Sequence, residues 1–82
     1  MTWNYRVVRH VVASLGETYY QIHEVYYNED GKIMSMTEKG IAPLGETTTE
    51  LQLELTRMLD ALKKPVLDYG VTDGKPEDWK ED

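Results

Sequence analysis

The chain has 82 residues, with nine Lys or Arg against 15 Asp or Glu, a net charge of −6 and no cysteine. Its length predicts one domain that buries only roughly 60–65% of the surface of the unfolded chain, so a second subunit is one of the few available sources of extra stability. The absence of cysteine excludes disulfides, thiolate zinc sites, iron–sulfur clusters and cysteine nucleophiles.

The charge distribution argues against nucleic-acid and membrane partners. Residues 68–82 carry six acids and two bases, so most of the negative charge lies at the C-terminal end. A negatively charged chain repels phosphate backbones and anionic membrane surfaces. No stretch approaches the roughly 18–20 apolar residues of a membrane span, and Arg6, Arg9 and His10 interrupt any apolar signal-peptide segment. We therefore expect a cytoplasmic protein that binds neither nucleic acid nor membranes.

Three strands are predicted in the first half of the chain. Residues 4–13 and 18–27 are rich in valine, tyrosine and other β-forming types, and residues 32–38 follow a turn-forming segment at residues 28–31. Gly16 suits a tight turn between the first two strands. The pattern predicts a three-stranded antiparallel meander.

One helix is predicted over residues 48–63. Thr47 and Glu50 have the spacing of a capping box, and Pro65 prevents further helix. Apolar residues then recur at helical spacing. This helical stripe consists of Leu51, Leu55, Met58, Leu59 and Leu62.

The C-terminal part of the chain is predicted to leave the domain. Residues 66–69 are interpreted either as a short fourth strand or as an extended segment packed on the sheet, so that residues 1–69 form a single α+β domain. Residues 70–82 are polar and acidic and are expected to form a flexible tail. Trp79 is the only aromatic residue of that tail, and it is either mobile or an anchor that docks on the sheet or on a partner.

The first two strands carry apolar and aromatic residues on both faces. A turn centred between Leu15 and Gly16 pairs Tyr5 with Tyr26. One face then carries Tyr5, Val7, Arg9, Val11, Tyr20, Ile22, Glu24 and Tyr26, and the other carries Arg6, Val8, His10, Val12, Tyr19, Gln21, His23, Val25 and Tyr27. One helix covers only one face, so we expect the other face to expose aromatic and β-branched side chains, which usually mark interaction sites.

This uncovered face is expected to bind a second copy of the chain, another protein or a ligand. The residues assigned to it are Tyr19, His23, Tyr27, His10 and Trp79. We interpret the chain as a non-enzymatic protein-interaction module, and we expect it to form a homodimer through this face. The opposing interpretation is a tyrosine-rich face that simply remains in contact with water.

The two histidines, His10 and His23, come from adjacent predicted strands. Two neighbouring imidazoles bind metals or exchange protons, which gives the alternative of a small-ligand-binding or minor catalytic protein. Neither histidine has a clear further residue beside it to complete a metal site. We therefore favour the interpretation that both are half-buried structural residues of the sheet. Phosphate-binding glycine loops, nucleophile elbows and metalloprotease motifs are missing from the sequence. We expect no catalytic, cofactor or metal site, and a weaker alternative is an acidic inhibitor or antitoxin-like protein.

Several segments form a pattern that extends over nearly the whole chain up to Tyr69. They are residues 3–8, 22–27, 30–32 and 43–46, and the leucine-rich helix together with the residues 64–69 at its end. This pattern resembles a group of short, uncharacterised bacterial proteins, some of them found in mobile elements. That resemblance implies a small bacterial protein and transfers no functional residue. The order of a meander followed by a helix is also similar to the HicB-type antitoxin domain, without its usual DNA-binding element, which supports a small interaction module.

Overall fold

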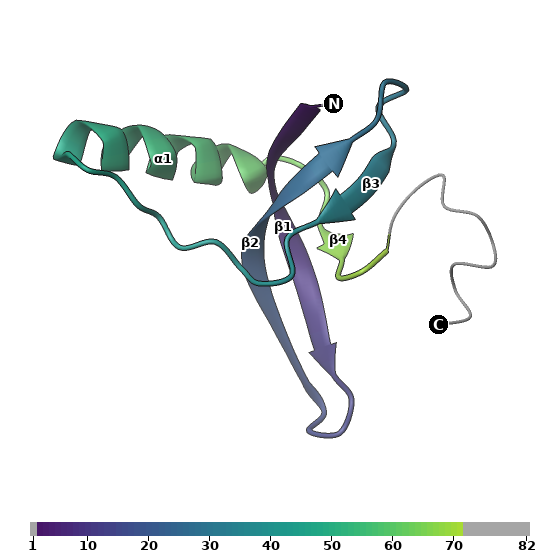
Figure 1. Ribbon diagram of the computed structural model, residues 1–82. Helices are drawn as coiled ribbons and strands as arrows, with labels where there is room; N and C mark the ends of the chain where they lie inside the picture. The colour runs from purple at the N-terminus through teal and green to yellow at the C-terminus, as the bar shows by residue number, and fades with distance from the viewer. Residues whose placement is uncertain (1, 72–82) are drawn as a thin grey trace.

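A computed structural model describes residues 2–71. Its elements are β1 (Thr2–Val12), β2 (Glu17–Tyr27), β3 (Ile33–Met36), α1 (Thr48–Ala61) and β4 (Leu67–Asp68) (Figure 1). The strand order in the sheet is β3-β2-β1-β4, with an antiparallel meander of β1 to β3 and a β4 that runs parallel to β1. The predicted α+β fold is confirmed, and the segment left open becomes a short fourth strand. The predicted tail from residue 72 onwards, including Trp79, lies outside the described residues.

β1 and β2 form a long hairpin whose register differs by two residues from the predicted one. Tyr5 pairs with Glu24 instead of Tyr26, because the turn comprises residues 13–16. Gly16 ends this turn with a φ of 65°, a left-handed conformation that glycine adopts without steric cost. Side chains alternate along a strand, so a shift of two residues leaves each of them on its predicted face.

α1 begins at the predicted N-cap. The hydroxyl of Thr47 accepts a hydrogen bond from the backbone N–H of Glu50 at 3.1 Å, and the Glu50 carboxylate accepts one from the backbone N–H of Glu46 at 3.0 Å. The first bond satisfies an N–H group of the first helical turn that has no partner within the helix, and the second holds the residue before the N-cap against that turn. The helix ends at Ala61 with Leu62 as its C-cap, two residues earlier than predicted.

The helix packs against β1 on one face of the sheet, and its N-terminal half projects to the left of the strands in Figure 1. The core between helix and sheet consists of the buried residues Tyr5, Val7, Met58 and Ala61, with Ile22 and Ile41 packed against them. The other face of the sheet is also closed at its centre, where Val8, Val25 and His23 are fully buried. The sheet therefore separates a larger buried cluster under the helix from a smaller one around His23.

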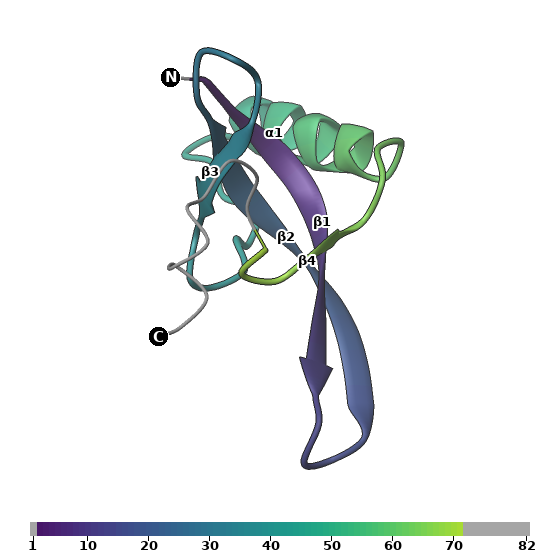
Figure 2. The same ribbon diagram turned by 90° about the vertical axis from the view of Figure 1, so that its right-hand side faces the viewer.

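The end of the β1–β2 hairpin projects beyond the other elements in both views (Figures 1 and 2). β4 pairs with β1 only at Val8 and Arg9, and β3 pairs with β2 only over residues 25–27. Every residue from 13 to 21 is exposed. We call residues 10–20 the hairpin arm. A two-stranded hairpin is only weakly stable by itself, so a partner that supports the arm would stabilise it.

Candidate functional site

The helix presents most of its apolar stripe to solvent. Met58 is buried, but Leu55, Leu59 and Leu62 are 47%, 60% and 65% exposed. Ala61 is fully buried beside Met58, which shows that the helix is rotated about its axis so that one flank of the stripe turns away from the sheet. Only part of the stripe seen in the sequence is therefore used to cover the sheet.

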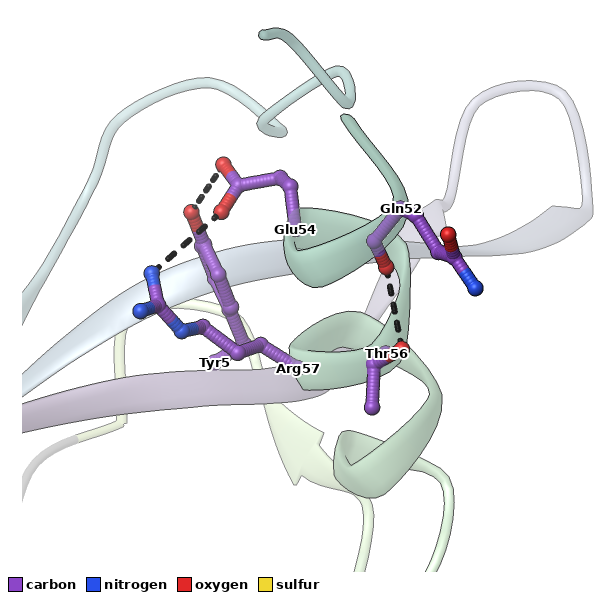
Figure 3. Close-up of polar contacts among 5 residues, drawn as sticks. All are labelled: Tyr5, Gln52, Glu54, Thr56 and Arg57. Carbon is purple, nitrogen blue, oxygen red and sulfur yellow. Dashed lines mark hydrogen bonds and ion pairs between the residues drawn. The ribbon is translucent and has the colours of Figure 1, made fainter. Parts of the chain in front are cut away.

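A contact between Tyr5 and Glu54 fixes the rotation of the helix about its axis. The Tyr5 hydroxyl donates a hydrogen bond to Oε2 of Glu54 at 2.5 Å, and Nη1 of Arg57 lies 3.9 Å from Oε1 of the same carboxylate. Figure 3 shows both groups pointing toward the Glu54 carboxylate. Burial, with a further contribution from the hydrogen bond to Glu54, raises the pKa of Tyr5 to about 12. Because a glutamate meets the sheet here, the leucines lie to one side of the contact between helix and sheet.

The exposed leucines line a groove between α1 and the sheet. Its volume is about 390 Å³, and its walls are Val7, Tyr20, Gln21, Ile22, Leu55, Met58, Leu59 and Leu62. Tyr20, on the hairpin arm, is 58% exposed. We call the surface formed by Leu55, Leu59, Leu62 and Tyr20 the leucine groove. Contiguous exposed apolar surfaces of this kind usually mark interaction sites.

On the opposite face, the structure brings His10 and His23 together. Their Nε2 atoms lie 2.8 Å apart, and Nδ1 of His23 lies 2.9 Å from the carbonyl oxygen of Thr37. A carbonyl oxygen only accepts hydrogen bonds, so Nδ1 of His23 carries a proton, and its N–H donates a hydrogen bond to the carbonyl oxygen of Thr37. In the neutral ring, Nε2 of His23 then accepts a hydrogen bond from the protonated Nε2 of His10. Both ring nitrogens of the fully buried His23 are thus satisfied.

Two tyrosines stack on His10. The ring centroids of Tyr19 and Tyr69 lie 4.7 and 4.6 Å from that of His10, with interplanar angles of 2° and 28°. Burial, with a smaller contribution from His23, lowers the pKa of His10. The cluster therefore favours a neutral imidazole. Beside it lies an open groove of about 560 Å³ lined by His10, Tyr19, Gln21, Glu38, Lys39, Gly40 and Tyr69.

The residues assigned to the interaction face from the sequence differ in their exposure. Tyr19 is 44% exposed, His10 and Tyr27 are half-buried, and His23 is fully buried. Trp79 is outside residues 2–71. This face offers a partner the rings of Tyr19 and of Tyr69, which is 43% exposed. The more extensive exposed apolar surface is the leucine groove on the helix side, which sequence reasoning did not select.

Among residues 2–71, no group of three or more histidine, aspartate or glutamate side chains is placed to hold a metal ion. The helix in this part of the chain is neither long enough nor apolar enough to cross a membrane. Comparison of the chain with protein-family models, with curated proteins and with solved structures gives no match. Function is therefore inferred from the residues of this chain.

Proposed function

We propose that the chain is a non-enzymatic protein-interaction module that self-associates through the leucine groove. The observation that carries this proposal is the exposure of Leu55, Leu59 and Leu62 along one flank of α1. Each leucine that passes from about half exposed to buried contributes roughly 1 kcal/mol. For a domain with a small core and no disulfide, this contribution is a substantial fraction of its stability.

A second copy of the chain is the occupant that the shape of this surface favours. The exposed leucines of α1 line one side of the groove, and residues of β1 and β2 line the other. The same patch therefore offers exposed apolar side chains and a recess that would receive those of a second copy. A two-fold symmetric interface requires such self-complementarity, because each copy contributes the same patch.

The hairpin arm supports the same proposal. Tyr20 lines the groove and belongs to the arm, so a copy bound in the groove also contacts the arm. Within residues 2–71, no third strand flanks residues 10–20. A partner that buries one face of this ribbon would supply the packing that a two-stranded hairpin needs.

The histidine cluster gives weaker support to a ligand-binding or catalytic role. His23 is fully buried, and both of its ring nitrogens are already hydrogen-bonded within the chain. His10 also uses its Nε2 in this pair. A ligand would have to compete with these bonds, whereas the leucine groove is open without any rearrangement.

Two charge substitutions on α1 test the proposal. Leu59 and Leu53 are similarly exposed, at 60% and 55%, but only Leu59 lines the groove. Leu59→Glu is expected to weaken self-association at least tenfold in sedimentation equilibrium, about 1.4 kcal/mol. Leu53→Glu is expected to associate like the unmodified chain. Equal association of Leu59→Glu and Leu53→Glu, with both variants folded by circular dichroism, would contradict the proposal.

A further inference from the structure

We infer that two copies pair through α1 in antiparallel orientation, with Leu59 against Leu59 of the second copy and Leu55 against its Leu62. This inference rests on the proposed self-association and specifies its geometry. It follows from the distribution of charge along the helix and from the spacing of the exposed leucines.

The two ends of the helical segment carry opposite charge. Acidic residues lie at or just before its beginning, at Glu46 and Glu50, and no base occurs from residue 46 to residue 56. Glu54 and Arg57 face each other beside Tyr5 on the sheet side, and Asp60 pairs with Lys63 at 3.3 Å, so the positive charge at the other end comes from Lys63 and Lys64. Antiparallel pairing sets the acidic end of one helix beside the basic end of the other, whereas parallel pairing brings like charges together. The helix dipoles favour the same orientation.

The leucine spacing fits this orientation. Leu55, Leu59 and Leu62 follow one another at intervals of four and three residues, the spacing of a helix–helix seam. With the two-fold axis beside Leu59, Leu55 and Leu62 lie at nearly equal distances on either side of the axis. Each copy therefore meets the other with leucines at all three positions.

The groove provides room for leucine side chains of the second helix. Its volume of about 390 Å³ lies beside the exposed flank of α1, and its floor includes Val7 and Ile22. Leucine side chains of the second copy entering this recess replace water by apolar contacts. The Tyr5–Glu54 contact, which sets the rotation of α1, is left in place because it lies on the sheet side of the helix.

Single-cysteine variants test the orientation without background, because the chain has no cysteine of its own. On mild oxidation, Leu59→Cys is expected to form a disulfide-linked dimer. Leu55→Cys and Leu62→Cys are each expected to cross-link poorly alone. Their equimolar mixture is expected to give a mixed disulfide in at least tenfold higher yield, measured by mass spectrometry. Leu53→Cys, outside the groove, is the control and is expected to remain monomeric on a denaturing gel.

The outcomes separate this inference from the proposed function. If Leu55→Cys and Leu62→Cys each cross-link efficiently with themselves, the helices are parallel and the inference is overturned, although self-association stands. A dimer by light scattering in which no groove cysteine cross-links, alone or mixed, overturns this inference and also the assignment of the interface to the leucine groove, because the interface then lies elsewhere. A chain that remains monomeric at all concentrations overturns both.

Discussion

The Nε2 atoms of His10 and His23 lie 2.8 Å apart, although the two residues come from different strands and pair with other neighbours in the ladder. The bond from Nδ1 of His23 to the carbonyl of Thr37 determines which ring donates in this pair. If both rings were charged, two N–H groups would face each other. Since Tyr69 stacks on His10, the pair connects β1, β2 and the segments that follow β3 and β4.

Acidification is expected to destabilise this cluster. The unfolded chain protonates His10 below about pH 6.5, its ordinary pKa, whereas burial and His23 lower that pKa in the folded chain. The unfolded state therefore binds more protons below pH 6.5, and the free energy of unfolding falls as the pH decreases, by at most about 1.4 kcal/mol per pH unit. The titratable and charged groups around His10 are His23, Tyr19, Tyr69, Glu38, Lys39, Arg9 and Asp68.

Thermal unfolding from about pH 8 to about pH 5 measures this effect. His10→Gln is the control, because glutamine keeps an N–H donor for His23 and does not titrate in this range. The variant is expected to lose less stability on acidification than the unmodified chain. The same pH profile for both proteins would show that His10 is not the group responsible.

Removing His23 is expected to cost more than removing His10. His23→Ala leaves a cavity at a fully buried position and removes the hydrogen-bond donor of the Thr37 carbonyl. We expect a loss of about 2–4 kcal/mol in chemical denaturation, and about 1–2 kcal/mol for the half-buried His10→Ala. A smaller loss for His23→Ala than for His10→Ala would mean that the buried ring is not a structural centre of this face.

Tyr5→Phe tests the contact that sets the rotation of the helix. The substitution keeps the ring but removes the hydrogen bond to the Glu54 carboxylate, whose side chain is only 18% exposed. The expected loss is about 1–3 kcal/mol in the free energy of unfolding. Tyr19→Phe is the control, because Tyr19 is 44% exposed and keeps its stacked ring, and its change should stay within about 0.5 kcal/mol. Equal losses would argue against a special role for the Tyr5–Glu54 bond.

Local patterns predicted the elements of the fold but not the pairing of its longest strands. Alternation along β1 and β2 assigned each side chain to its face, and this assignment withstands the two-residue change in register. The register itself depends on how many residues the turn uses, and that number follows from the conformation of residues 13–16, with Gly16 at positive φ. A glycine in the sequence allows this conformation without specifying its position in the turn.

The candidate site depended on contacts between residues far apart in the chain. The helical spacing of the leucines predicted the apolar stripe of α1. The side of the helix that meets the sheet depends on the hydrogen bond between Tyr5 and Glu54, which are 49 positions apart in the chain. The short β4 is likewise held by contacts with a distant segment, a backbone hydrogen bond from the N–H of Tyr69 to the carbonyl of Arg9 at 3.0 Å and an exposed ion pair at 2.6 Å between Arg9 and Asp68. The sequence signal that could have indicated the rotation of α1 is Glu54 beside the leucine stripe, together with Tyr5 on a predicted strand.

Burial of the leucine groove by a second copy of the chain is measured by light scattering behind a sizing column, over a wide range of concentration. If the groove pairs two chains, the mass rises to twice the 9.5 kDa of one chain as the concentration increases. A mass of 9.5 kDa at every concentration would contradict self-association and leave Leu55, Leu59 and Leu62 exposed in the isolated protein.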